Sequence, residues 1–342
     1  MEAPEPRANP LLLGHEPAEA ALADAMRSGR LHHAWLISGP PGIGKATLAF
    51  RFARRLLAGR PEGDSLALDP VHPVFRRVAA GTHADLLTLE RSYDEKRNRM
   101  RTQIAVDEVR RISAFMRLTP AEGGWRVTIV DGAQDMNQNA ANALLKILEE
   151  PPPRSVLLLV CDAPGRLLPT IRSRCTRLRL SALDDVTMGR LLATYAPDLA
   201  EDQRARLAAL AGGSPGRALI LGEGEGLKLA SMVADVLRDL PALGSARGYE
   251  VADALGRSET GFGIFMDLLR ASLAAALGAA VRGRADAEQQ RLAHLHPLDA
   301  WGDVWHALGQ LQDETERLNL DKRQAIVAGL DLLSGRAAPG IP

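Results

Sequence analysis

The stretch "AWLISGPPGIGKATLAF" at residues 34–50 constrains the fold more than any other part of the sequence. The apolar run 34–38 predicts a buried strand, and the G-x-x-x-x-G-K pattern after it leads into a stretch with helical periodicity. In that order, the N–H groups of a glycine-rich loop and of a helix N-terminus can bind phosphate. The candidate nucleotide-binding residues in this stretch are Gly39, Gly42, Gly44, Lys45, Ala46 and Thr47.

The residue after Lys45 departs from the pattern of a working phosphate-binding loop. A nucleotide hydrolase needs a hydroxyl at that position to bind Mg²⁺, and this sequence has Ala46. Thr47 lies one residue further on, about 100° around the helix from the required direction. Two interpretations of Thr47 stay open: it supplies the missing metal ligand, or it caps or packs locally.

A second element of a nucleotide hydrolase is an apolar strand that ends in an acid, followed by a Glu that polarises water. The segment "VTIVDGAQ" supplies Asp131 as that acid, but Gly132 stands where the Glu would be. Because hydrolysis needs both the metal and an activated water, we expect weak or absent ATPase activity. Lys45 and the glycines still permit ATP or ADP to bind without catalysis, so the sequence leaves nucleotide binding at this degenerate loop open.

The first half of the chain alternates strand-like and helical patterns. Strand-like runs occur at 34–38, 86–90, 125–133, 155–161 and 176–183, with helical patterns at 45–59, 105–118 and 137–150. This alternation predicts an α/β fold, a parallel sheet with helices on both faces. After about residue 183 only helical patterns remain. We therefore predict three domains, at 1–182, 183–223 and 224–342.

Charge and cysteine content exclude several classes of protein. Lys plus Arg and Asp plus Glu each number 42, so the formal net charge is zero. A stand-alone nucleic-acid-binding protein usually carries excess positive charge, so contact with DNA must be local or shared among subunits. The two cysteines, Cys161 and Cys175, are too few for a disulfide framework or a four-cysteine zinc site, and they fit a reduced cytosolic compartment.

We expect neither a secretory leader nor a membrane anchor. The N-terminal segment "MEAPEPRANP" lacks the pattern of a signal peptide, and the apolar run at 271–281 is too short to span a bilayer. The sequence therefore predicts a soluble intracellular protein.

Two further segments carry a resemblance to a known family. Residues 142–152, "NALLKILEEPP", and residues 167–175, "LLPTIRSRC", are similar to the bacterial DNA polymerase III clamp loader, a branch of the AAA+ superfamily. The segments "LHHAWLISGP", "AGTHADLLTLE" and "LNLDKRQAIVAGL" are more similar to delta-prime subunits than to the gamma/tau motor subunits. The resemblance runs from about Leu31 to the C-terminus and is weakest at 60–80 and 225–300.

The resemblance implies an AAA+ P-loop core, a small three-helix lid and an all-α collar that holds a five-subunit ring together. The implied partners are the gamma/tau and delta subunits, the sliding clamp and, through the assembled complex, primed DNA. Such a complex opens the clamp and places it on DNA as part of the DNA polymerase III holoenzyme. No membrane partner is implied, and a cytoplasmic location follows.

The resemblance also implies roles for individual residues. Arg174, in "SRC", would be an arginine finger that reaches the ATP site of a neighbouring motor subunit and stabilises charge on the transferring phosphoryl group. Without the flanking motif it would read as a surface or ion-paired arginine. Arg217, in "GGSPGRAL", matches a lid arginine near the γ-phosphate, or is a helix N-terminal residue paired with a local acid. Cys161 falls where motor subunits carry a polar sensor, and we interpret it as a buried packing residue because a thiol is a poor hydrogen-bond donor.

We expect no required cofactor and no zinc. Family members often carry a four-cysteine zinc module between the glycine-rich loop and "AGTH". In this sequence the same interval has no cysteine, and the histidines His72 and His83 are its possible zinc ligands. Two histidines cannot assemble four ligands.

Two other functions compete with the delta-prime interpretation. One is an AAA+ motor subunit that hydrolyses ATP itself, which Ala46, Gly132 and the missing cysteines disfavour. The other is a P-loop kinase, for which no acceptor-binding or catalytic-base motif is present.

Several remaining polar and aromatic residues have simple structural interpretations. His32 and His33 flank a strand, Asp94 and Glu95 lie in a solvated charged loop, and Trp301 and Trp305 are one helical turn apart and suit packing. Arg110, Arg111 and Arg117 share the polar side of one predicted helix. That side faces either DNA inside the ring or solvent.

Overall fold

The computed structural model describes residues 3–59, 65–94, 99–101, 103–122, 124–255 and 261–336. The chain divides into two compact units, Met1–Leu219 and Ile220–Pro342. The first contains the β-sheet and the glycine-rich loop. The described part of the second is helical.

The core of the first unit is a five-stranded parallel sheet. Its strands are β2 (Leu86–Leu89), β5 (Arg126–Asp131), β6 (Ser155–Cys161), β1 (Ala34–Ser38) and β7 (Thr176–Arg179), in that spatial order. All four pairings are parallel. Strand β1 lies between β6 and β7 and is buried along its whole length, which is why its sequence is a continuous apolar run. The predicted parallel α/β fold is confirmed.

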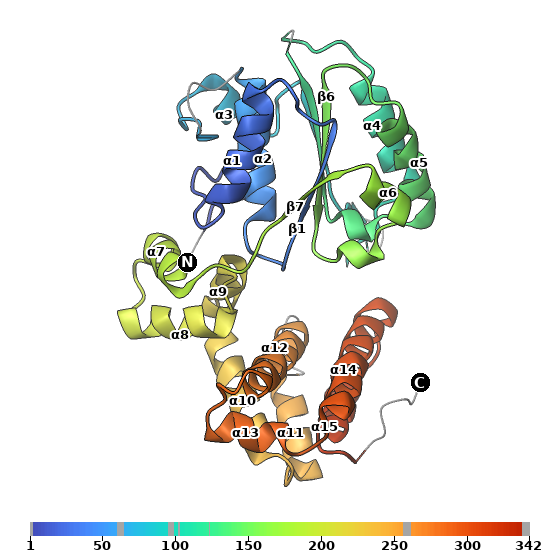
Figure 1. The fold of residues 1–342 in the computed structure, drawn as a ribbon. Helices are drawn as coiled ribbons and strands as arrows, with labels where there is room; N and C mark the ends of the chain where they lie inside the picture. Colours follow the sequence, from blue (N-terminus) through green and yellow to red (C-terminus); the bar gives the residue numbers. More distant parts are fainter. Residues whose placement is uncertain are drawn as a thin grey trace. The chain divides into compact units, whose positions relative to one another are not determined.

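Helices cover both faces of this sheet, as predicted (Figure 1). One face carries α1 (Glu16–Arg27), α2 (Lys45–Leu57) and α3 (Pro73–Ala79), and the other carries α4 (Val106–Met116), α5 (Gln138–Glu149) and α6 (Pro169–Ser173). Because side chains alternate along a strand, Ile37 enters the core under α1–α3 while Leu36 enters the core under α4–α6.

For several helices and strands, the predicted first and last residues agree with the observed ones to within a few positions. Strands β1 and β6 agree with the predicted ranges, and β7 is an edge strand, as its alternating burial suggested. In α4 the apolar residues Val109, Ile112 and Met116 are buried. Helix α1 was not predicted. Within the charged segment 91–101, β3 (Tyr93–Asp94) and β4 (Arg99–Met100) form a short antiparallel pair. Asp94, which was predicted to lie in a solvated loop, is therefore in a strand.

Three short helices follow the sheet. They are α7 (Asp185–Tyr195), α8 (Glu201–Ala211) and α9 (Pro215–Gly222). Asp184 begins α7 by accepting the Thr187 N–H at 2.8 Å, a typical N-cap. The unit boundary falls inside α9, so α7 and α8 belong to the same compact unit as the sheet. The finer division into domains at 182 and 223 stays a prediction.

The second unit is built from six helices in its described part. They are α10 (Gly226–Asp239), α11 (Ser245–Leu255), α12 (Gly261–Val281), α13 (Ala287–Ala293), α14 (Leu298–Leu318) and α15 (Lys322–Leu333). Helix α12 packs against α10, α13 and α14, and α15 packs against α11 and α14. Trp301 is fully buried, and Trp305 donates its indole N–H to the Arg270 carbonyl at 3.2 Å. Both tryptophans therefore serve packing, as predicted.

The prediction that no segment is long enough to cross a bilayer needs correction. Helix α12 has 21 residues and contains an 18-residue window with a mean hydropathy of 1.7, sufficient in length and composition for a membrane span. The apolar run at 271–281 is only the second half of this helix, which begins at Gly261. A single such helix is weak evidence for a membrane protein, and one side of α12 is buried at Phe265, Leu269 and Leu273 within the helical unit.

Candidate functional site

The glycine-rich loop joins β1 to α2, as the sequence predicts. Gly42 and Gly44 have φ of +73° and +101°, a region that side-chain-bearing residues rarely adopt. A Cβ at Gly42 would also lie 2.5 Å from Ser214 Oγ. Glycine at 42 is therefore required both by the backbone and by the close approach of the segment before α9.

The loop is tied directly to that segment. Ser214 Oγ donates to the Pro41 carbonyl at 2.9 Å, and the Gly216 N–H donates to the Gly42 carbonyl at 2.9 Å. On the other side of the loop, His15 Nε2 lies 2.7 Å from the Ile43 carbonyl oxygen. Contacts to α1 and to the start of α9 thus fix the conformation of the loop.

Lys45, the candidate phosphate-binding lysine, is already engaged by groups of this chain. Its side chain is 4% exposed, and its Nζ lies 2.6 Å from Asp162 Oδ1. Nζ also donates to the Pro40 carbonyl. Asp162 was not predicted as a site residue. The sequence held part of the signal, because Asp162 directly follows the predicted strand 155–161. The pairing of β6 with β1, which brings the carboxyl ends of the two strands to one edge and Asp162 to Lys45, is seen only in the structure.

The carboxylates of Asp131 and Asp162 and the hydroxyl of Thr47 line the pocket that contains Lys45. Asp131 ends β5 and lines the same pocket as Lys45. Burial raises the pKa of Asp131, with Glu90 and Asp162 adding to the rise and Lys45 opposing it. Gly132 adopts φ of +78° in the turn after β5, so a Glu at that position would be strained. Thr47 lines the pocket, and its two interpretations stay open.

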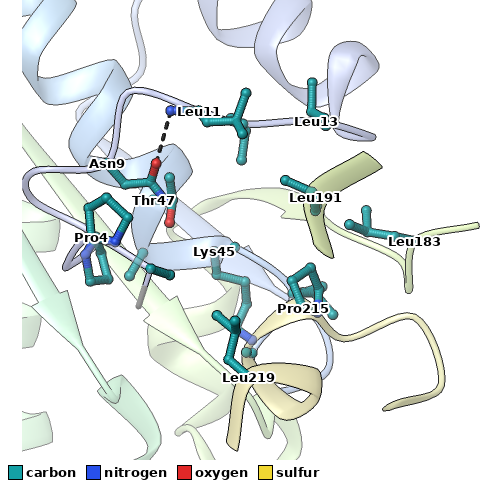
Figure 2. Close-up of a pocket in the computed structure, with 18 of the residues that line it drawn as sticks. Pro4, Asn9, Leu11, Leu13, Lys45, Thr47, Leu183, Leu191, Pro215 and Leu219 are labelled. Atoms are coloured by element: carbon teal, nitrogen blue, oxygen red, sulfur yellow. Dashed lines mark hydrogen bonds between the residues drawn. The ribbon is translucent and has the colours of Figure 1, made fainter. Parts of the chain in front are cut away.

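The pocket around Lys45 has a volume of about 340 Å³. Figure 2 shows Lys45 and Thr47 with apolar side chains gathered around them. The wall of the pocket is formed by residues 3–13, here called the N-terminal strap, by α2, and by the region of α7 and α9. The predicted residues Gly42, Gly44, Lys45, Ala46, Thr47 and Asp131 line the pocket, whereas Gly39 and Arg217 do not. The backbone N–H of Arg217 donates to Ser214 Oγ at 3.2 Å.

Two arginines of α2 hold the N-terminal strap. Arg54 is 1% exposed, donates to the carbonyls of Arg7 and Asn9 at 2.8 Å each, and lies over the Phe75 ring. Burial, with Arg51 nearby, lowers its pKa to about 10. Arg51 binds Glu19 and the Pro10 carbonyl. The Asn9 amide in turn donates to the Tyr195 hydroxyl of α7 at 2.9 Å. The strap thus connects α2 to α7 over the pocket.

Arg174 lies away from this pocket, just after α6. Its Nη2 is 2.9 Å from Glu149 Oε1 at the end of α5, and its Nη1 donates to the Thr170 carbonyl at 3.0 Å. The side chain is 36% exposed. Arg174 is not among the residues that line the Lys45 pocket. The "LEEPP" and "SRC" segments are therefore in direct contact.

The remaining candidate residues are engaged in capping, packing or hydrogen bonds to the main chain. His32 and His33 hydrogen-bond backbone carbonyls at the start of β1 and the end of α5. Cys161 is fully buried, and burial raises its pKa to about 11, which fits a packing residue. His72 caps α3, and Nδ1 of His83 accepts the Asp85 N–H. Within the described residues, no group of three or more His, Cys, Asp or Glu is arranged to bind a metal. Glu95 lies outside the described residues.

Comparison with known proteins decides the family. A family model described as DNA polymerase III, delta subunit, matches residues 14–184, half of the chain. The chain belongs to this family. Its sequence is 42% identical over 183 residues to the DNA polymerase III delta-prime subunit of Pseudomonas aeruginosa, covering 54% of this chain and 53% of the relative. The predicted resemblance to clamp-loader delta-prime subunits is confirmed.

Two further relatives are informative. The Escherichia coli delta-prime subunit is 35% identical over 206 residues, covering 60% of this chain and 58% of the relative. The Escherichia coli tau subunit is 32% identical over 173 residues, covering 51% of this chain and 25% of the relative. The chain spans little more than half the length of the delta-prime relatives it matches.

Proposed function

We propose that this chain is the delta-prime subunit of a cytoplasmic DNA polymerase III clamp loader and supplies an arginine to the ATP site of a neighbouring subunit. The observation that carries the proposal is the position of Arg174. It belongs to the family's "SRC" segment, is partly exposed, and lies outside the chain's own nucleotide-like pocket. An arginine in that position is available to another chain.

The chain's own pocket favours little or no ATP hydrolysis. Ala46 offers no hydroxyl to Mg²⁺, and the positive φ of Gly132 disfavours a water-activating Glu. Both functions are needed for hydrolysis. No metal or cofactor is required for the proposed role, and zinc is not expected.

The contacts of Arg174 are suited to presenting a guanidinium. Glu149 and the Thr170 carbonyl each hold one terminal nitrogen, which restricts the rotamers of a long side chain. A guanidinium held in this way loses less conformational entropy when it binds the phosphoryl group of a neighbour. In the proposed complex, that neighbour is a gamma/tau subunit.

The second unit is the proposed collar that binds the gamma/tau and delta subunits. Its described residues expose several large apolar side chains: Tyr249, Val281, Leu298, Leu318 and Leu320. Exposed apolar residues of this kind suit an obligate interface. The assembled ring, and not this chain alone, would engage the sliding clamp and primed DNA.

A groove between α4 and α5 is the proposed contact with DNA. It is about 550 Å³ in volume and is lined by Arg110, Arg117, Lys146, Asn139 and Asn142 among others. Arginine, lysine and amide side chains are the usual partners of DNA phosphates. Arg110 also pairs with Asp107 at 2.9 Å, and Arg111 does not line the groove.

The alternative function is an AAA+ motor subunit that hydrolyses ATP itself. The similarity to a tau subunit favours it, while Ala46 and the Lys45–Asp162 contact disfavour it. Magnesium-dependent ATP hydrolysis by the purified chain, lost in Lys45→Ala, would establish the alternative.

Reconstitution tests the proposal. The chain is mixed with gamma/tau and delta subunits, assembly is measured by pull-down, and ATPase is measured with clamp and primed DNA. We expect Arg174→Ala to assemble normally but to lower the stimulated ATPase rate by about 10³-fold at each site that receives the arginine. Arg166→Ala, in the same exposed region, is the matched control. An unchanged ATPase with Arg174→Ala would refute the arginine-finger role.

A further inference from the structure

The pocket around Lys45 is large enough for part of a nucleotide but is wrongly charged for one. Its volume of about 340 Å³ lies in the usual range of small-molecule sites. Its lysine, however, is bound to Asp162 and to the Pro40 carbonyl. A triphosphate and the Asp162 carboxylate would compete for the same ammonium group.

The main chain of Asp162 is held by groups on neighbouring elements, although its side chain is 42% exposed. Its own N–H donates to Gln134 Oε1 at 3.1 Å, so the turn after β5 fixes the residue after β6. Cys161, immediately before it, is paired with Ser38 of β1 and fully buried. The carboxylate is therefore delivered to Lys45 by two neighbouring strands of the sheet and is not a chance contact of a mobile loop.

The surrounding charges also oppose an incoming anion. Besides Asp162, Asp131 lines the pocket, and the pKa of Asp131 is raised by burial with contributions from Glu90 and Asp162. The cation that normally screens such carboxylates from phosphate is Mg²⁺, and Ala46 removes one of its ligands. The residues present thus do not fit a bound nucleoside triphosphate.

We propose that Asp162 is a built-in anion that takes the place of a nucleotide phosphate on Lys45, and that it keeps the pocket closed to polyphosphates. The glycine-rich loop would then have its phosphate-bound geometry without any ligand. This inference concerns the chain's own pocket and holds whether or not Arg174 acts on a neighbouring subunit.

Removing the carboxylate should open the site. We expect the purified wild-type chain to show no measurable binding of ADP or inorganic tripolyphosphate by titration calorimetry at low salt. Asp162→Asn, which preserves the shape of the side chain, should bind tripolyphosphate with a Kd at least about tenfold below the weakest Kd that the titration can detect. Asp162→Asn combined with Lys45→Met should lose that binding, because the gain depends on the freed ammonium group.

Controls separate this effect from general changes in charge and folding. Asp202→Asn, at an exposed position on α8, removes the same charge and should bind like the wild type. Asp162→Ser serves as a second opening variant if Asp162→Asn folds poorly, as judged by circular dichroism. The proposal is overturned if the wild type binds ADP at micromolar concentration, or if neither Asp162 variant binds tripolyphosphate more tightly than Asp202→Asn. Neither result would bear on the ATPase of the reconstituted loader.

Discussion

The guanidinium of Arg174 and the carboxylate of Glu149 form an ion pair with a 2.9 Å separation between Nη2 and Oε1. This pair joins the end of α5 to the end of α6, and so links the two sequence segments that carry the family resemblance. The side chains are 36% and 49% exposed. Solvent screens pairs of this kind, and their net contribution to stability is small.

Arg174→Ala should therefore lower the free energy of unfolding by less than about 1 kcal/mol. Glu149→Ala should have an effect of similar size, and urea denaturation measures both. A small effect is what allows an ATPase defect in the loader to be assigned to the arginine itself. A loss above about 2 kcal/mol for Arg174→Ala would instead show that the pair is a structural element of the sheet unit.

Asp85, in the "AGTHAD" segment, should be far more important for stability than Arg174. Its carboxylate accepts the N–H groups of Ala121 and Glu122, at 2.8 and 3.1 Å, and pairs with Arg126 at 3.4 Å. Both charged side chains are almost completely buried. Because Asp85→Ala leaves a buried guanidinium without its carboxylate, we expect a loss of about 3–5 kcal/mol.

Urea denaturation measures this loss of stability. One control variant and one double variant show whether the loss comes from the ion pair. Asp198→Ala, at an exposed position, should change stability by no more than about 0.5 kcal/mol. In the double variant Asp85→Ala with Arg126→Met, the loss should be smaller than the sum of the two single losses. Simple additivity would mean that the two charges do not stabilise one another.

Acidification should destabilise the fold through two histidines, His83, which is buried, and His33, which is half-buried. Burial lowers the pKa of His83 below its ordinary value of 6.5, and burial together with His32 lowers that of His33. The unfolded chain therefore binds more protons than the folded chain just below pH 6.5, so the free energy of unfolding falls as the pH drops. This contribution is present at pH 7 and is lost progressively as the pH falls below about 6.5, the ordinary pKa of histidine, towards the lowered folded-state pKa values.

His83→Asn tests that assignment. Asn keeps an acceptor for the Asp85 N–H, which now bonds to Nδ1 of His83, but it does not titrate. The decline in unfolding free energy between pH 7 and 5, followed by urea titrations at each pH, should become shallower in the variant. Equal slopes in variant and wild type would exclude His83 as a source of the decline.

Alanine substitution at two glycines should separate backbone strain from steric contact. Gly29 and Gly42 have similar φ, +69° and +73°, but a Cβ at Gly29 meets nothing within 4 Å while one at Gly42 lies 2.5 Å from Ser214 Oγ. We expect Gly42→Ala to lower the free energy of unfolding by at least about 1 kcal/mol more than Gly29→Ala does. In a Ser214→Ala background the difference should shrink. If it does not, the contact with the segment before α9 is not what requires glycine at 42.

If the groove between α4 and α5 binds DNA, removing its basic side chains should weaken DNA binding. Changing Arg117 and Lys146 together to Ser should weaken primed-DNA binding by the reconstituted loader. It should also reduce the slope of log affinity against log salt concentration by about 2, as expected when two phosphate contacts are lost. The control changes Arg30 and Arg76, exposed arginines near the helices on the other face of the sheet. Equal losses in both pairs would indicate a general charge effect and not a specific groove.

Much of the fold could be predicted because local patterns agree with it. Strand β1 is a continuous apolar run since it is buried on both faces, and α5 begins at a capping Asn137 and ends just before three prolines. Helix α1 was not predicted, although it carries ordinary helix signals: Glu16 and Pro17 open it, and its buried residues Ala18, Leu22 and Met26 recur at helical spacing. The prediction about a bilayer considered only the apolar run at 271–281, although the helical pattern around that run covers 263–281 and the observed α12 begins at Gly261.

The site residues that belong to one continuous segment of the sequence could be predicted. Those brought together by neighbouring strands or helices from distant parts of the chain could not. The loop residues around Lys45 follow from their spacing, and so does the acid at the end of β5. The partners of those residues come from elsewhere in the chain. Asp162 reaches Lys45 only because β6 lies beside β1, and Glu149 reaches Arg174 only because α5 and α6 cover the same face. Residue spacing does not encode such neighbours.

The N-terminal strap has a practical consequence for work on this protein. Ala3 and Pro4 line the pocket that contains Lys45, so a peptide tag or dye attached just ahead of them emerges at the rim of that pocket. A fluorophore placed there would report directly on whether the cavity fills or empties. For the same reason, affinity handles intended to be silent belong elsewhere on the molecule.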